Sequence, residues 1–147
     1  MSSLKEEIIA VFPDARFSPA ANEEKIALAE IQMGITIPDA LRWFLKDADG
    51  VKADYGSGLI WSIEEIQTKN AEFRTLADFR ELYMPFTALL FFADDGGGDQ
   101  FAFPVHADGV IHREDVFRWD HETDARIWFA GNLSRYVQMR SSDSNNE

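Results

Sequence analysis

The chain has 147 residues, of which 46% are hydrophobic and 13% aromatic, which predicts one folded domain and excludes a disordered chain. It contains no cysteine, which excludes disulfides, zinc–thiolate sites, iron–sulfur clusters and thiol catalysis. The 26 acidic residues against 14 basic ones give a net charge of −12, which disfavours binding to nucleic acids and to anionic membranes.

The ends of the chain carry no sign of membrane insertion or export. No segment approaches the roughly 20 apolar residues of a membrane helix, and the first residues lack the basic and apolar parts of a signal peptide. We therefore expect a cytoplasmic protein with a single domain over residues 1–140. The tail 141–147 contains no apolar residue, and we expect it to be disordered.

The first half of the chain has the apolar spacing and the capping residues of helices. We expect helices over residues 4–12, ended by Pro13; 22–34, with Asn22 as N-cap and Gly34 after the end; 38–50, opened by Pro38 and ended by Gly50; and from Ser62, which has the capping-box spacing with Glu65.

The second half has the patterns of strands and turns. We expect strands at residues 87–93, 100–104 and 115–120, a further one at 110–111, and a closing helix capped by Asn132. Helices first, an antiparallel meander next and a helix last predict an α+β fold, with N-terminal helices and a C-terminal helix packed on a central antiparallel sheet.

The negative charge is concentrated in the second half. Between Asp94 and Asp124 there are nine acidic residues, opposed by Arg113 and Arg118, so this stretch carries −7 of the net charge. All three histidines also lie in it. An electrostatic function, if the protein has one, is therefore expected here.

The glycine-rich segment 94–99 invites a phosphate-binding interpretation, which we reject. Three Asp side chains flank its glycines and a strand follows, whereas a phosphate loop needs a helix N-terminus and usually a Lys. Its acids also lack the spacing of a calcium loop. A hairpin turn is the favoured interpretation, and an added role as a binding loop stays open.

The histidines do not have the spacing of a metal site. His106 and His112 are six residues apart across a turn, which matches no zincin helix. A catalytic base at His121, next to Asp120 and Glu122, is an open alternative, but a hydrogen-bonded turn residue is favoured. We expect no catalytic residue, no metal and no cofactor.

The four tryptophans divide into two groups by their neighbours. Trp43 and Trp128 stand among apolar residues, and we expect them in the core or half-buried. Trp61 and Trp119 border polar turns, where they would suit an interface anchor. Packing at the edge of the core is nevertheless the favoured interpretation for this second pair.

Three segments carry sequence motifs that we consider together. In the first, Glu30, Gly34, Ile37-Pro38, Phe44-Leu45 and Asp49-Gly50 form a Glu, a Gly four residues on, an apolar–Pro pair and an aromatic–Leu helix with an Asx-Gly ending. Residues 91–103 form an apolar strand, an acidic glycine turn and an aromatic strand, and residues 116–122 end in Trp-Asp-His-Glu. With the closing helix at 133–137, the chain resembles the SUKH superfamily of Smi/Knr-type cell-wall synthesis regulators and bacterial toxin-immunity proteins over about residues 22–140; Asp49 departs from the family's Asn.

The resemblance implies an α+β fold and no enzymatic activity. Many bacterial members are immunity proteins encoded beside secreted toxins, often nucleases, and fungal members resemble regulators that act as protein-interaction hubs. We therefore expect an immunity protein of a polymorphic toxin system, which neutralises a cognate secreted or contact-dependent toxin by direct binding. The alternative is a regulatory interaction module that recognises a peptide or a modified protein.

The expected partner is a basic protein toxin, and the protein itself is expected to be a monomer or weak dimer. An acidic surface can cover the basic site of a nuclease and speed association through long-range attraction. We place the partner-binding site on acids and adjoining aromatic or imidazole groups: Asp94, Asp95, Asp99, Trp119, Asp120, His121, Glu122, Asp124 and Trp61.

Overall fold

A computed structural model describes residues 3–53 and 56–145, with side chains described up to residue 142. In this part of the chain the helices are α1 (Leu4–Val11), α2 (Glu23–Met33), α3 (Asp39–Asp47), α4 (Ile63–Thr75), α5 (Ala77–Leu82) and α6 (Leu133–Asn145). The strands are β1 (Arg16–Phe17), β2 (Val51–Ala53), β3 (Ser57–Ile60), β4 (Leu89–Asp94), β5 (Gln100–Pro104), β6 (Val116–Trp119) and β7 (Arg126–Ala130). The mixed helix and sheet arrangement confirms the predicted α+β class.

The predicted helix caps are present. The Asn22 side chain accepts a hydrogen bond from the Lys25 backbone N–H, and Gly34 ends α2 in the left-handed conformation at φ 71°. Ser62 and Glu65 form the expected capping box at the start of α4. Pro38 occupies the N-cap of α3, one position before the first helical residue.

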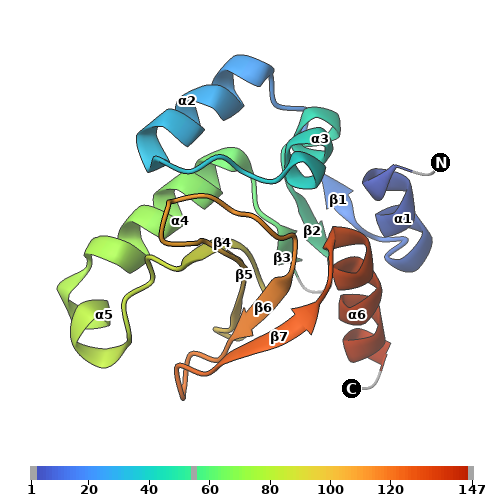
Figure 1. The fold of residues 1–147 in the computed structure, drawn as a ribbon. Helices are drawn as coiled ribbons and strands as arrows, with labels where there is room; N and C mark the ends of the chain where they lie inside the picture. The colour runs from blue at the N-terminus through green and yellow to red at the C-terminus, as the bar shows by residue number, and fades with distance from the viewer. Residues whose placement is uncertain (1–2, 54–55, 146–147) are drawn as a thin grey trace.

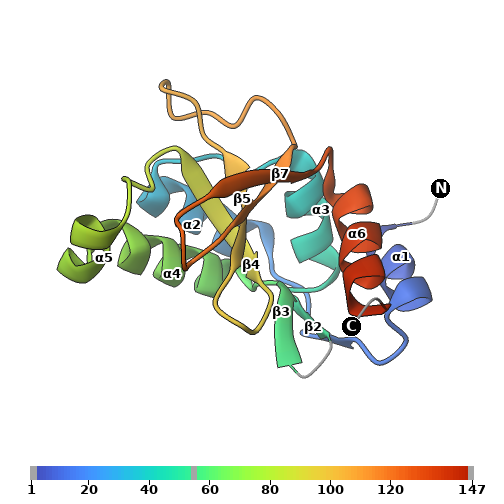
Figure 2. The same cartoon turned by 90° about the horizontal axis from the view of Figure 1, so that it is seen from below.

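The strands form two antiparallel sheets that meet side by side (Figures 1 and 2). One has the order β1-β2-β3 and the other β4-β5-β6-β7. The backbone N–H of Trp61, just after β3, donates to the Phe92 carbonyl of β4 at 2.8 Å and so connects the two. One residue before Phe92, the side-chain amide of Asn70 in α4 bonds to the backbone N–H and carbonyl of Phe91 at 2.9 and 2.8 Å. The amide thus supplies the hydrogen bonds that a neighbouring strand would supply.

Both faces of the four-stranded sheet are covered by helices. Phe91 and Trp119 contact Phe73 of α4, whereas Phe92 and Phe101 contact Tyr136 of α6. The Tyr136 hydroxyl donates to the Leu59 carbonyl at 2.6 Å, and burial raises the pKa of Tyr136 to about 12. The core is thus continuous from the first sheet through the second to α6.

Several elements differ from the sequence-based expectation. The strands β1, β2 and β3 lie in the half expected to be helical, and each is too short to show a periodic pattern. The strand expected at residues 110–111 is absent, because Val110 bonds within its own turn to Asp108 and His106. Helix α6 reaches Asn145 and so covers most of the segment 141–147; residues 146–147 lie outside the described part, and the domain limits stay a prediction.

The tryptophans expected in the core are exposed. Trp43 is 66% exposed, because it lies off the buried stripe of α3 made by Leu41, Phe44 and Leu45. Trp128 is 58% exposed on β7, the last strand of its sheet. No helix in the described ranges has the length and apolar character needed to cross a membrane.

The Asn70 amide predicts a large effect of substitution on stability. Asn70→Leu keeps the size of the side chain but leaves the Phe91 N–H and carbonyl without partners, so we expect a loss of about 2–4 kcal/mol in the free energy of unfolding. Chemical denaturation measures it. The control Thr68→Leu, on the exposed side of the same helix, is expected to change stability by no more than about 0.5 kcal/mol. Equal effects of the two changes would contradict the strand-like role of Asn70.

Candidate functional site

Two acidic turns lie at the same end of the four-stranded sheet. The antiparallel register pairs Asp94 with Gln100, Gln100 with Trp119, and Trp119 with Arg126. The β4–β5 and β6–β7 turns therefore lie beside each other. Together they carry six carboxylates, which we call the acidic end: Asp94, Asp95, Asp99, Asp120, Glu122 and Asp124.

The remaining acids of the charged segment lie elsewhere. Asp108, Glu114 and Asp115 belong to the loop between β5 and β6, which is at the opposite end of these strands. His106 and His112 are in this loop too, with ring centroids 4.8 Å apart. The acids that form one charged segment in the sequence therefore lie at two opposite ends of the sheet.

Asp94 is bonded inside the protein. Its carboxylate accepts hydrogen bonds from the Trp61 indole N–H at 2.6 Å and from the backbone N–H groups of Gly58 and Gly96 at 3.3 and 2.9 Å. A Cβ on Gly58 would lie 2.6 Å from the Trp61 ring and 2.7 Å from the Asp94 carboxylate, so only glycine fits there. Trp61 is 1% exposed, and both side chains therefore fix the β4–β5 turn to β3.

Arg118 is placed between the other two acids of the β4–β5 turn. Its guanidinium contacts the Asp95 carboxylate at 2.9 Å and the Asp99 carboxylate at 3.0 Å. Arg118 is not among the site residues predicted from the sequence. Its position between Phe117 and Trp119 on a strand that leads into the acidic turn was the available signal.

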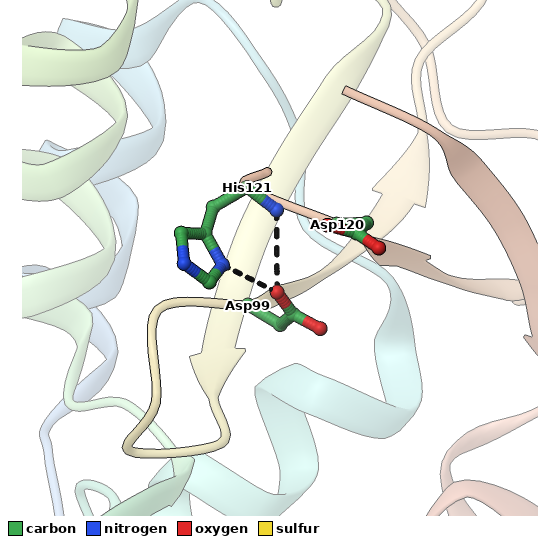
Figure 3. Close-up of side chains that lie close together, drawn as sticks. All are labelled: Asp99, Asp120 and His121. Carbon is green, nitrogen blue, oxygen red and sulfur yellow. Dashed lines mark hydrogen bonds and ion pairs between the residues drawn. The ribbon is translucent and has the colours of Figure 1, made fainter. Parts of the chain in front are cut away.

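Asp99 also forms a hydrogen bond with the His121 imidazole (Figure 3). Nδ1 of His121 lies 2.6 Å from the Asp99 carboxylate, and the His121 backbone N–H donates to the same oxygen at 3.2 Å. Burial tends to raise the pKa of Asp99, but the bonds from His121 and Arg118 outweigh it and hold this pKa below its usual value. The bond to Asp99 in turn raises the pKa of His121.

Asp124 repeats the arrangement seen at Asp94. Its carboxylate accepts from the Trp119 indole N–H at 2.7 Å and from the Met84 backbone N–H at 2.8 Å, and Arg126 lies 3.3 Å away. Burial opposes the effect of these donors, which together hold the pKa of Asp124 below its usual value. Trp119 is 2% exposed and lies edge-on to Phe86. The predicted anchor is therefore part of the core.

Asp120 and Glu122 are the acids with the fewest internal partners. One oxygen of Asp120 accepts the backbone N–H groups of Glu122 and Thr123 at 2.9 and 3.3 Å, which forms the turn. The Glu122 side chain is exposed and bonds to no other described residue. Glu122 is the exposed acid of the acidic end, whereas Asp120 is half-buried like the other four acids.

The acidic end has one group with the composition of a cation site. Ligand atoms of Asp99, Asp120 and His121 lie within 4.8 Å of one another. Both Asp99 oxygens are engaged, however, one by His121 and one by the Arg118 guanidinium, which would repel a cation. We assign no metal to it. Among the described residues, His121 contacts no serine or threonine hydroxyl that would form a nucleophile pair.

A comparison with protein-family models matches residues 23–137 to the SUKH_6 family, described as SMI1-KNR4 cell-wall. The matched part is well over half of the chain. None of the curated proteins matches.

The family-pattern residues of the first half have structural roles. Glu30 accepts the Ile37 backbone N–H at 2.8 Å and the Arg42 guanidinium, and so holds the turn between α2 and α3. Asp49 accepts the Ile63 N–H at 2.8 Å at the start of α4. A Cβ on Gly50 would lie 2.7 Å from the Ser62 nitrogen. These residues build the fold that positions the acidic end.

The His121–Asp99 pair predicts a pH-dependent stability. A raised folded pKa means that protonated His121 stabilises the fold fully below its unfolded value of 6.5, and that this contribution is lost as pH rises through the folded value. The lowered pKa of Asp99 keeps the pair intact until strongly acidic pH. The advantage of the wild-type chain over His121→Gln should therefore shrink as the pH rises from about 6.5 through the raised pKa of His121.

Denaturation across this pH range measures the difference, and imidazole NMR titration reports the pKa directly. The exposed His106, at the other end of the sheet, supplies the control: His106→Gln should keep the wild-type pH dependence. A stability difference between wild type and His121→Gln that stays constant through the alkaline range would show that the pair does not form in solution.

Proposed function

Because the chain belongs to the SUKH_6 family, described as SMI1-KNR4 cell-wall, we propose that it is a cytoplasmic bacterial immunity protein that neutralises a cognate toxin by direct, non-catalytic binding. Proteins of this family are generally non-catalytic immunity or regulatory proteins. The single observation that carries the proposal is the gathering of six carboxylates at one end of the sheet.

The internal bonds divide the acidic end into two roles. Protein donors hold four of the acids in place, so these acids contribute a negative electrostatic potential and a fixed surface shape. They are Asp94, Asp95, Asp99 and Asp124. Exposed Glu122 and half-buried Asp120, the acids with the fewest internal bonds, form the centre of the contact with the partner. Since held carboxylates do not need to be ordered on binding, the surface loses little side-chain freedom when the complex forms.

The partner is proposed to be basic, such as a nuclease toxin. A nuclease needs cations where it grips a phosphate backbone. Rigid carboxylates at fixed spacing imitate that polyanion, and their field raises the rate of encounter. The net charge of −12 extends this attraction beyond the contact itself.

The alternative of a regulatory module that binds through Trp61 and Trp119 has less support. Both side chains are at most 2% exposed, and each indole N–H is already bonded to an aspartate of the protein. A partner would have to displace these bonds to reach either ring. We therefore keep the carboxylates and His121 as the proposed contact and assign the two tryptophans to its support.

Charge changes at Asp120 and Glu122 test the proposal. The double variant Asp120→Asn with Glu122→Lys keeps a turn-forming acceptor at 120, neutralises the charge of Asp120 and reverses the charge of Glu122. We expect association with the cognate toxin domain to slow about tenfold at low salt, with the difference shrinking as salt rises. Stopped-flow binding and protection of growth on co-expression measure it.

The opposite end of the sheet supplies a matched control. In Asp108→Asn with Glu114→Lys the charge change is the same, and Asp108 also accepts a backbone N–H, from Val110 at 3.0 Å. We expect this variant to slow association less than about twofold. If both double variants bind at the same rate, the acidic end is not the contact surface.

A further inference from the structure

A hollow of about 290 Å³ lies between the end of α4, α5 and the segment that follows α5. Aromatic rings and two arginines line much of it: Phe73, Arg74, Phe79, Arg80, Tyr83 and Phe86. It is formed where α5 and the segment after it fold back beside the end of α4, away from α1 and α6 (Figures 1 and 2). No acidic residue lines it.

The two arginines have no carboxylate partner. Among the side chains that the structure describes, no Asp or Glu oxygen lies within 4.0 Å of the Arg74 or Arg80 guanidinium. In a chain with 26 acidic residues, two unpaired guanidinium groups on one hollow are unexpected from composition alone. They place two positive charges on the lining of the hollow, while the neighbouring acids Asp78 and Glu81 of α5 are not part of this lining.

The Arg74 guanidinium makes only part of its possible hydrogen bonds within the described structure. Its guanidinium donates to the Leu89 carbonyl at 2.8 Å, while its buried Nε has no acceptor. Burial lowers the pKa of Arg74, which means that its surroundings disfavour the charge. An anion placed against the guanidinium would relieve this cost.

Exposed apolar side chains lie beside the hollow. No residue of α5 is buried, and Leu82 and Met84 are 70% and 67% exposed. Aromatic, Met and Arg side chains are the types enriched at protein interfaces, and a ring-lined depression beside them suits an apolar anchor residue.

We propose that this hollow binds an acidic, apolar segment of a partner protein. A carboxylate of the segment pairs with Arg74 and Arg80, and an adjacent apolar side chain packs on the Phe79 and Tyr83 rings. Charge complementarity selects such a segment, because the hollow is basic while the acidic end requires a basic partner. The site therefore has a different specificity from the one in the proposed function.

The hollow and the acidic end share one connecting segment. The Tyr83 hydroxyl donates to the His121 carbonyl at 2.9 Å, and Arg126 donates to the Met84 carbonyl at 2.8 Å. Two binding surfaces of opposite charge thus lie on either side of residues 83–85. A partner with a basic site and an acidic apolar segment could engage both.

Peptide titration tests the site on the intact chain without any toxin. The probe is acetyl-Asp-Phe-Glu-Leu-amide, and the matched control is acetyl-Asn-Phe-Gln-Leu-amide. At about 0.15 M salt, where long-range repulsion is screened, we expect saturable amide NMR shifts confined to residues 73–87, with a Kd of about 1 mM or tighter. The uncharged peptide should bind about tenfold more weakly.

Two arginine variants separate this site from general attraction. Arg80→Gln, at an exposed position, should weaken binding of the acidic peptide about tenfold. Arg135→Gln removes an equal charge from α6, where the arginine also lacks a carboxylate partner within 4.0 Å among the described side chains, and should leave binding unchanged. Absence of saturable shifts, equal binding of both peptides or equal effects of the two variants would overturn the proposal.

Discussion

Repulsion among carboxylates is the constraint that shapes this protein. The antiparallel strand order places two acidic turns next to each other, and unit charges at such distances repel strongly unless they are compensated. The compensation comes from within the same sheet. Arg118 reaches two of the carboxylates, His121 reaches one of these again, and Arg126 reaches another. The acidic end is therefore a bonded structure rather than a loose collection of surface charges.

The two tryptophans near these turns also help to compensate the negative charge of the carboxylates. Trp61 donates to Asp94 and Trp119 donates to Asp124, at 2.6 and 2.7 Å, so each acidic turn is fixed by one indole. The rings fill the core while their polar edges reach the turns, which is the ordinary way for this side chain to be buried. Fold stability and surface charge are thus coupled through the same two residues.

The helix caps and the strand order were predictable because their signals are local. Asn22, Gly34, Ser62 and Glu65 act within three or four residues of themselves, and the β4, β5 and β6 patterns are contiguous. The burial expected for Trp43 and Trp128 was wrong, whereas the favoured packing of Trp61 and Trp119 against the core is found. Burial depends on partners distant in sequence: Trp61 bonds to Asp94, whereas Trp43 lies just off the buried stripe of its helix. The six acids of the proposed site can be listed from the sequence, but the division into held and free carboxylates needs contacts such as Arg118–Asp95 that span more than twenty residues.

The acidic end is the proposed contact with the toxin, and the hollow beside α5 is proposed to bind an acidic segment. Hydrogen–deuterium exchange of the protein with and without its partner tests this most directly, because amides in both turns are read in one experiment. We expect protection to appear in residues 94–99 and 120–125 together, since the two turns form one surface. Protection confined to residues 105–115, or to the helices α2 and α3, would contradict the acidic end as the place where the partner binds.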